Sequence, residues 1–111
     1  MKTVSVKNVS FGPRDFGLIA GPCVIESEDH AVHMAGSIKE IVDGLNIKMI
    51  FKSSFDKANR SSITSFRGLG LDEGLKILDK VKSEIDFPIL TDIHLTEQAD
   101  PVSEGVDIIQ L

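Results

Sequence analysis

The residues best suited to chemistry in this sequence are the cations of one polar stretch, residues 51–62, which reads FKSSFDKANRSS. Lysine and arginine side chains bind phosphate and carboxylate oxygens, and serine and asparagine add neutral hydrogen-bond donors. This combination is suited to holding a small substrate that is doubly anionic or doubly phosphorylated. A solvated surface loop, in which the cations only confer solubility, is the alternative interpretation.

The charge pattern favours anion binding. The chain of 111 residues has a net charge of −5, yet its acids pause after Asp43 and resume only at Asp72. Within that window a single acid, Asp56, is set against the cations Lys48, Lys52, Lys57, Arg60 and Arg67. The polar stretch therefore lies in a locally positive field. No glycine-rich turn opens a helix here, so a nucleotide-binding loop of the usual kind is not indicated.

The single cysteine, Cys23, follows Gly21-Pro22 at the end of a predicted strand. It excludes an internal disulfide and leaves three roles for the thiol. A lone cysteine is most often a small buried filler. It can also be a nucleophile, or a ligand of an open metal site whose other donors come from distant strands.

Polar residues also mark the last two predicted strands. Asp92 and His94 alternate and therefore face one side, where they could orient a substrate hydroxyl, ligate a metal or shuttle a proton. A hydrogen-bonded buried pair is the alternative. Gln110 ends the final strand. His30 and His33 lie on the polar side of a predicted helix, which is more typical of a helix surface than of a metal site.

Hydrophobic patterning predicts the elements that position these residues. Alternating valines predict a strand or hairpin in residues 2–10, and short apolar runs predict buried strands at 16–22, 47–52, 87–94 and 106–111. Helices are predicted from about Ala31 to Gly44 with Ser27 or Asp29 as cap, from Leu71 to Ile85 with Asp72 as cap, and more weakly after Thr96, where Pro101 intervenes. Such alternation favours a parallel sheet with crossover helices, whose strand ends share one rim.

Composition restricts the class of protein. With 41% hydrophobic and 26% charged residues and no linker-like tract, the chain is typical of one soluble globular domain. No apolar run reaches the roughly 18 residues that span a bilayer, and no signal peptide precedes the fold, so the cytoplasm is the expected location. The negative net charge and the lack of Trp and Tyr argue against nucleic-acid binding.

Five segments together resemble the 3-deoxy-D-manno-octulosonate 8-phosphate synthases, a family also called 2-dehydro-3-deoxyphosphooctonate aldolases. They are IAGPCVIES (19–27), FKSSFDKANRSS (51–62), SFRGLGLDEGLKIL (65–78), ILTDIH (89–94) and VDIIQL (106–111). The resemblance covers essentially the whole chain, and the FKxSFDKANRSS element is highly specific. The related DAHP synthases carry a KPRT-type loop instead, which is absent here.

The resemblance implies a (β/α)8 TIM barrel that condenses phosphoenolpyruvate with D-arabinose 5-phosphate. The products would be 3-deoxy-D-manno-octulosonate 8-phosphate and phosphate, on the pathway to the Kdo sugar of lipopolysaccharide. The implied substrate-binding residues are Lys52, Ser54, Lys57, Asn59, Arg60, Ser61, Asp92 and Gln110, of which Lys57 and Asp92 are also the implied catalytic residues. Lys52 and Lys57 would bind phosphoenolpyruvate, and the segment from Asn59 to Ser61 the pentose phosphate. A homo-oligomer is implied, a tetramer in the family.

The same resemblance gives Cys23 a role. The family has a metal-dependent class with Cys at this position and a metal-independent class with Asn, so Cys23 implies a divalent ion of the Fe, Zn or Mn type. The other ligands, a His, a Glu and an Asp, would lie outside this chain.

Length is where this sequence departs from the family. A complete barrel needs about 250 residues. We therefore expect one domain, 1–111, that is the N-terminal half of a barrel: a hairpin in residues 1–12, resembling the one that plugs the family's barrel floor, then about four parallel strands with crossover helices in residues 16–111. The last strand would be left uncovered unless something else, such as a second copy, covers it. Such a chain should be inactive or nearly so by itself.

Two other functions stay open on sequence alone. One is a related phosphoenolpyruvate-dependent sugar-acid synthase of the DAHP synthase superfamily, which a comparison of sugar acceptors would distinguish. The other is a non-catalytic, anion-binding half barrel. A downstream His, Glu and Asp at strand ends would favour an enzyme over this second alternative.

Overall fold

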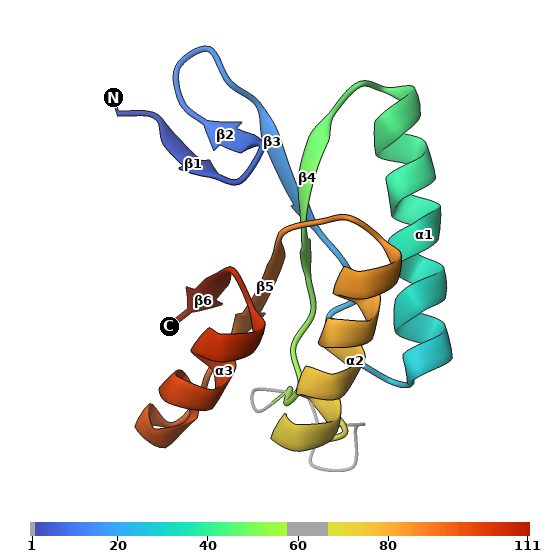
Figure 1. Ribbon diagram of the computed structural model, residues 1–111, viewed down its shortest axis with the longest axis vertical. Helices are drawn as coiled ribbons and strands as arrows, with labels where there is room; N and C mark the ends of the chain where they lie inside the picture. Colours follow the sequence, from blue (N-terminus) through green and yellow to red (C-terminus); the bar gives the residue numbers. More distant parts are fainter. Residues whose placement is uncertain (1, 58–66) are drawn as a thin grey trace.

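The computed structural model describes residues 2–57 and 67–111, in which a short hairpin is followed by alternating strands and helices (Figure 1). The strands are β1 (Val4–Val6), β2 (Val9–Phe11), β3 (Gly17–Ala20), β4 (Lys48–Lys52), β5 (Ile89–Asp92) and β6 (Ile108–Gln110). The helices are α1 (Glu28–Gly44), α2 (Leu71–Glu84), the 3-10 turn η1 (Thr96–Gln98) and α3 (Ala99–Gly105). The strands and helices predicted from hydrophobic patterning are confirmed, with ends shifted by a few residues.

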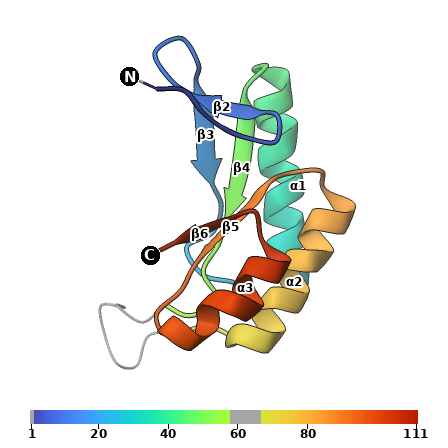
Figure 2. The same ribbon diagram turned by 60° about the vertical axis from the view of Figure 1, so that its left-hand side comes forward.

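The strands after the hairpin form one four-stranded parallel sheet in the order β3-β4-β5-β6. Each consecutive pair is joined by a crossover that contains a helix, and the helices lie together on one side of the sheet (Figure 2). The hairpin strands pair antiparallel. This confirms the predicted parallel α/β architecture and agrees with half of a (β/α)8 barrel. In the described residues no helix is long and apolar enough to cross a membrane.

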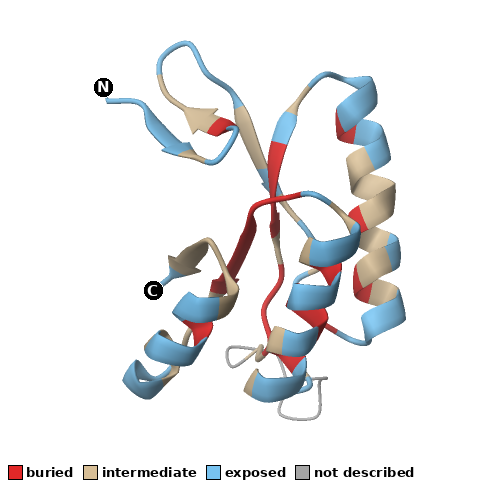
Figure 3. Cartoon of the chain, viewed as in Figure 1, coloured by how far each residue is buried: buried red, intermediate tan, exposed pale blue. Residues whose placement is uncertain are grey.

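Alternate residues of the strands enter two separate hydrophobic layers. Phe51 in β4 is fully buried on the helix side and stacks on Phe87, with ring centroids 6.3 Å apart. Ile50 faces the other way and packs with Leu90 and with Val9 of the hairpin. Figure 3 shows the buried positions running along β4 and β5. The hairpin thus covers the sheet face opposite the helices, in agreement with its resemblance to a barrel-floor plug.

Of the predicted helix caps, the one for α1 is confirmed and the one for α2 is wrong. The Ser27 hydroxyl accepts a backbone N–H of the first turn of α1 (3.0 Å), so Ser27 rather than Asp29 is the cap. The prediction of Asp72 as the cap of α2 is wrong, because Gly70 occupies that position. The chain enters α2 through a positive φ of 89° at Gly70, which glycine tolerates, and the helix starts one residue before Asp72.

The end of α1 is predicted correctly but for a different reason. The helix ends at Gly44, yet the residue with left-handed backbone is Asn46, whose φ is 56°. The N–H of Ile47 donates to the Val42 carbonyl (2.9 Å), which is the long hydrogen bond of a Schellman motif. Asparagine is the residue after glycine most tolerant of this conformation, so it ends the helix here.

The weakly predicted helix after Thr96 is present as η1 followed by α3. Pro101 lies in the first turn of α3, where a backbone nitrogen needs no intrahelical acceptor. The Gln98 side chain accepts the N–H groups of His94 (2.8 Å) and Leu95 (3.1 Å), which fixes the turn leaving β5. A proline in this position therefore does not prevent the helix.

Asp107, just before β6, joins three parts of the chain. Its carboxylate accepts the Ile89 N–H at the start of β5 (2.8 Å). It also lies 3.2 Å from Lys7 in the hairpin turn and 3.6 Å from Lys82 of α2. Burial by itself raises the pKa of Asp107, but the Ile89 N–H and the two ammonium groups outweigh burial and hold this pKa below its usual value.

We expect Asp107→Asn to lower the free energy of unfolding by about 1 kcal/mol at neutral pH, because the amide still accepts a hydrogen bond but loses both ion pairs. The folded-state pKa of Asp107 is depressed, so its stabilisation is complete above the unfolded pKa of about 4 and is lost as the pH falls through the folded value. Urea unfolding followed by circular dichroism should show the difference between the two proteins shrinking as the pH is lowered below about 4. An undiminished difference at acid pH would contradict this.

Candidate functional site

Three polar side chains extend the strands just beyond the hydrophobic layer that faces the hairpin. Lys52, Asp92 and Gln110 each follow, by two positions, an apolar residue of that layer in β4, β5 and β6. Side chains two apart on a strand share a face, so these three point to the same side of the sheet. A hollow of about 210 Å³ is lined by them and by Cys23, Ser54, Asp56 and Lys57. The prediction that strand-end side chains gather at one rim is confirmed for these residues.

The segment after β4 is fixed to the segment after β3 by main-chain hydrogen bonds. The Ser54 N–H donates to the Cys23 carbonyl (3.1 Å), and the Ile25 N–H donates to the Ser54 carbonyl (2.8 Å). The buried Ser53 hydroxyl adds a bond to the Pro22 carbonyl (2.7 Å). Cys23 is thereby held at a fixed position beside the cationic segment.

The same segment is fixed on its other side to β5. The Ser53 N–H donates to the Leu90 carbonyl (3.3 Å), and the Thr91 hydroxyl donates to the Ser53 carbonyl (2.7 Å). Ser53 and Thr91 are among the few buried polar residues of the described chain. Sequence reasoning missed both, because a serine in a polar loop and a threonine in a strand give no signal until strand pairing brings them together.

The turn that carries Asp56 and Lys57 is organised by Ser54. The Ser54 hydroxyl donates to the Asp56 carbonyl (2.8 Å) and accepts the Asp56 N–H (3.1 Å). Its only proton is therefore directed at the main chain and not at an anion in the hollow. The substrate-binding role that the resemblance implies for Ser54 stays a prediction.

Arg67 forms an ion pair with Asp56, the single acid between Asp43 and Asp72. Its Nε lies 2.6 Å from Asp56 Oδ1 and its Nη2 lies 3.1 Å from Oδ2, which is a bidentate pair. This hydrogen bonding, together with attraction to the carboxylate, raises the pKa of Arg67. Because Arg67 offsets the charge of Asp56, the positive charges of Lys52 and Lys57 are left to set the potential on this side of the hollow.

Asp92 has an oxygen available for a ligand. Its Oδ2 lies 3.6 Å from His94 Nε2, whereas its Oδ1 is buried and has no hydrogen-bond partner among the described residues. The two side chains therefore do share a side, as predicted, but they are not the fully hydrogen-bonded pair of the alternative interpretation. The edge of the Phe55 ring contacts the His94 ring, with centroids 5.9 Å apart and planes at 70°. A buried carboxylate oxygen without a partner is suited to accept a hydrogen bond from a substrate hydroxyl.

The described residues supply at most part of a metal site. In residues 2–57 and 67–111, no group of three or more His, Cys, Asp or Glu side chains could hold a metal ion. Cys23 is exposed at the hollow and offers one sulfur donor, so the other ligands of an ion would have to come from elsewhere. His30, whose Nδ1 is 3.5 Å from Glu26, and His33 lie on α1, where the predicted helix-surface interpretation is favoured.

Three site residues implied by the resemblance, Asn59, Arg60 and Ser61, lie outside the described residues. The pentose-phosphate role implied for them stays a prediction. The described part of the site consists of Cys23, Lys52, Ser54, Lys57, Asp92 and Gln110.

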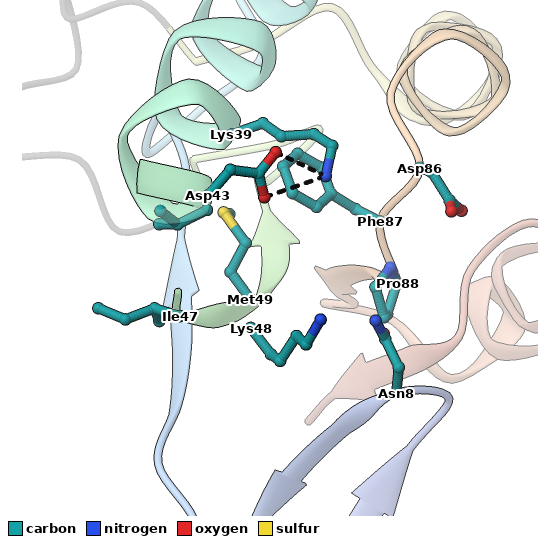
Figure 4. Close-up of a pocket in the computed structure, with 10 residues that line it drawn as sticks. Asn8, Lys39, Asp43, Ile47, Lys48, Met49, Asp86, Phe87 and Pro88 are labelled. Carbon is teal, nitrogen blue, oxygen red and sulfur yellow. Dashed lines mark hydrogen bonds and ion pairs between the residues drawn. The ribbon is translucent and has the colours of Figure 1, made fainter. Parts of the chain in front are cut away.

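A second cavity lies at the opposite ends of the strands (Figure 4). Its volume is about 50 Å³, enough for a water or two but not for a phosphorylated metabolite. Lys39 there is within 3.4 Å of both oxygens of Asp43 and its ammonium lies 5.2 Å from the centre of the Phe87 ring. Lys48 also lines this cavity, but its small volume makes it a weaker candidate for an anion site than the hollow at the rim.

Comparison with known proteins gives one family for the chain. A sequence model described as the DAHP synthetase I family matches residues 2–111. Among curated proteins named 2-dehydro-3-deoxyphosphooctonate aldolase, that of Synechococcus sp. is 58% identical over 85% of this chain and 33% of its own length. The Bordetella petrii protein of that name is 61% identical over 86% of this chain and 34% of its own length. The Geobacter metallireducens protein of that name is 50% identical over 99% of this chain and 41% of its own length. This chain thus spans only about a third to two fifths of such relatives.

Proposed function

Because this chain belongs to the DAHP synthetase I family, we propose that its hollow is the phosphoenolpyruvate side of an aldol-type condensation site. Phosphoenolpyruvate and one water molecule would react with D-arabinose 5-phosphate to give 3-deoxy-D-manno-octulosonate 8-phosphate and inorganic phosphate. The observation that carries the proposal is that Lys52 and Lys57 line one hollow with Asp92 and Gln110. The names of the similar proteins support this reaction over others of the family. Such a protein would act in the cytoplasm, in the synthesis of the Kdo sugar of lipopolysaccharide.

The charges of the hollow suit the difficulty of this reaction. Both substrates carry phosphate groups and repel each other, so their carbons meet only if cations neutralise them first. Lys52 and Lys57 would hold the phosphate and carboxylate of phosphoenolpyruvate and leave its terminal methylene carbon facing the aldehyde carbon of the pentose phosphate. Holding two reactants in this way removes much of the entropic barrier to bond formation.

Asp92 would fix the second substrate. Its Oδ1, buried and without a partner among the described residues, would accept a hydrogen bond from a sugar hydroxyl. Lys57 and Asp92 would then lie on either side of the new carbon–carbon bond, which is the basis of the catalytic role proposed for both. Gln110, at the end of β6, would contact the phosphoenolpyruvate end of the hollow.

Cys23 would be one ligand of a divalent ion of the Fe, Zn or Mn type, since its sulfur is exposed at the hollow. When bound, such an ion supplies Lewis-acid activation of a water or carbonyl oxygen. The remaining ligands would come from outside the described residues. Because these residues complete neither the metal site nor the pentose-phosphate side, we expect the 111-residue chain by itself to release little or no phosphate. The whole enzyme would be a homo-oligomer.

The anion site can be tested by titrating phosphoenolpyruvate into the chain and measuring heat. We expect Lys52→Ala to weaken binding about 10- to 100-fold, because a charge-assisted hydrogen bond contributes roughly 1.5–3 kcal/mol. Lys57→Ala should have a similar effect. Lys48→Ala is the matched control, because Lys48 is an exposed lysine at the other end of the same strand.

Equal weakening by Lys48→Ala would show a general charge effect and overturn the assignment of the hollow, as would a complete lack of binding by the unaltered chain. The reaction itself is followed by release of inorganic phosphate from phosphoenolpyruvate. Steady release by the isolated chain, dependent on arabinose 5-phosphate, would contradict the expectation that this chain is inactive.

A further inference from the structure

We propose that Ser53 and Thr91 are positioning residues of the hollow, whose buried hydroxyls hold together the three chain segments that line it. These segments follow β3 and β4 and end β5, and they carry Cys23, the two lysines of the hollow, and Asp92, respectively. Neither Ser53 nor Thr91 lines the hollow itself. The proposal rests on the function proposed above and adds to it the residues that fix the geometry of the site.

The side chains of both residues point away from the hollow. Ser53 comes two positions after Phe51, which belongs to the helix-side core. Thr91 comes two positions after Ile89, which belongs to the same core. Side chains two apart along an extended chain share a face, so the two hydroxyls lie on the helix side and opposite Lys52. They can therefore influence a bound anion only through the main chain that they hold.

Hydroxyl groups are unusual on the helix side of this sheet. The buried polar residues of the described chain are Ser53, Ser54 and Thr91, and all three lie where β4 and β5 end. The core beside them is apolar, so alanine or valine would fill the space without the cost of burying a polar group. Only hydrogen bonds compensate that cost, so the bonds of these hydroxyls indicate what the residues do.

The Thr91 hydroxyl ties β5 to the segment after β4 where these two strands separate. The paired register of β4 with β5 ends at Lys52, whereas β5 stays paired with β6 as far as Asp92. Past Lys52, the Ser53 N–H donates to the Leu90 carbonyl (3.3 Å), and the Thr91 hydroxyl donates to the Ser53 carbonyl (2.7 Å). This side-chain bond continues the pairing and sets how far the lysine-bearing segment lies from Asp92.

The Ser53 hydroxyl makes the corresponding tie to the segment after β3. It donates to the Pro22 carbonyl (2.7 Å), next to Cys23. Main-chain bonds extend this contact, from the Ser54 N–H to the Cys23 carbonyl (3.1 Å) and from the Ile25 N–H to the Ser54 carbonyl (2.8 Å). Ser53 is thus bonded to both neighbouring segments at once. Groups held in this way lose little freedom when a ligand binds, which favours affinity.

Two substitutions of Thr91 separate positioning from packing. Thr91→Val keeps the shape and removes the hydroxyl, whereas Thr91→Ser keeps the hydroxyl and removes a buried methyl group. In heat titrations, Thr91→Val should weaken phosphoenolpyruvate binding about three- to tenfold, and Thr91→Ser should stay within about twofold of the unaltered chain. Urea unfolding should nevertheless show Thr91→Ser destabilised by the lost methyl group. Binding that follows the hydroxyl rather than the stability identifies positioning.

Hydrogen exchange measured by NMR tests the same bonds without any ligand. Thr91→Val should speed exchange of the Ser53 N–H about tenfold, because opening of the segment after β4 becomes easier. Ser53→Ala should do the same for the N–H groups of Ser54 and Ile25. The Phe51 N–H, which donates to a carbonyl inside the sheet region (3.0 Å), should stay within about twofold in both variants.

Ser83→Ala is the matched control. The Ser83 hydroxyl also donates to a main-chain carbonyl, that of Lys80 (2.9 Å), but it lies on α2 and does not line the hollow. This variant should change neither phosphoenolpyruvate binding nor the exchange rates. An equal effect of Ser83→Ala would overturn the proposal, as would acceleration that includes the Phe51 N–H, which indicates general destabilisation.

The binding results can also contradict the proposal. It is wrong if Thr91→Val binds phosphoenolpyruvate as tightly as the unaltered chain, or if Thr91→Ser binds as weakly as Thr91→Val. If the unaltered chain binds no phosphoenolpyruvate, the proposed function of the hollow fails. The exchange pattern then decides whether the hydroxyls hold the three segments, and unchanged rates at Ser53, Ser54 and Ile25 would show that they do not. If Ser53→Ala does not fold, as judged by circular dichroism, the two Thr91 variants decide.

Discussion

Replacing Phe51 with alanine is expected to destabilise the chain by about 3–5 kcal/mol, the largest single effect among our predictions. The side chain is completely buried and stacks on Phe87 at 6.3 Å with rings nearly parallel. Removing it loses the burial of an aromatic ring and leaves a cavity between the sheet and its helices. Because single domains are stable by only about 5–15 kcal/mol, a large fraction of the molecules could unfold.

Phe16→Ala is the matched control for this prediction, since the Phe16 ring is 73% exposed. Its unfolding free energy should stay within about 0.5 kcal/mol of the unaltered chain. Urea unfolding followed by circular dichroism measures both. If Phe51→Ala costs no more than Phe16→Ala, the helix-side core is not formed as described.

The second large effect is expected at Gly74 in α2. Alanine in the middle of a helix normally stabilises it relative to glycine by about 1 kcal/mol. At Gly74 the added Cβ would lie 2.4 Å from the Cβ of Phe55, which cannot move without shifting the main chain. Gly74→Ala should therefore destabilise the chain by about 1–3 kcal/mol, the reverse of what helix propensity predicts.

Gly36→Ala in α1 provides the comparison. There the nearest heavy atom to the added Cβ is Ile85 Cδ1 at 3.8 Å, an ordinary contact, so helix propensity should prevail with a gain of about 0.5–1 kcal/mol. Thermal or urea unfolding should thus give opposite signs for the two substitutions. Equal signs would show that α2 does not approach the main chain at Phe55 this closely.

The Gly74 contact also concerns the site. Phe55 belongs to the turn that Ser54 organises, between Ser54 and Asp56 in the sequence. Its ring contacts the ring of His94. A shift of its main chain would move the segment that carries Lys57 relative to Asp92. We therefore expect Gly74→Ala to weaken phosphoenolpyruvate binding as well, whereas Gly36→Ala leaves it unchanged. Heat titration of the folded variants measures this difference.

Much of the fold could be predicted because the spacing of apolar residues and the length of each segment indicate the same type of element along most of the chain. The apolar runs of β4 and β5 and the stripes of α1 and α2 are unambiguous, and alternation of the two types leaves few topologies other than a parallel sheet. The rim then follows, because the carboxyl ends of parallel strands meet. This reasoning predicts that Cys23, Lys52, Asp92 and Gln110 lie together, and they line one hollow.

The features that sequence reasoning missed depend on close approach between segments far apart in the chain. Asp107 falls in the predicted last strand and gives no sign of its partners until β5 and the hairpin turn bring Ile89 and Lys7 to it. Likewise Gly70, not Asp72, occupies the cap position of α2, because the chain returns past Phe55, whose carbonyl accepts the Gly70 N–H (3.2 Å). Local propensity cannot detect a partner that only the tertiary fold supplies.

Because successive side chains of β4 point to opposite faces of the sheet, neighbouring residues have different roles. Phe51 belongs to the helix-side core, and Lys52, the next residue, belongs to the hollow. Sliding this strand by one position would drive an ammonium group into the core and turn a large aromatic ring toward the rim. The charge that would receive the substrate thus also penalises misalignment during folding, so a chain with the wrong strand register would lose stability and binding capacity together.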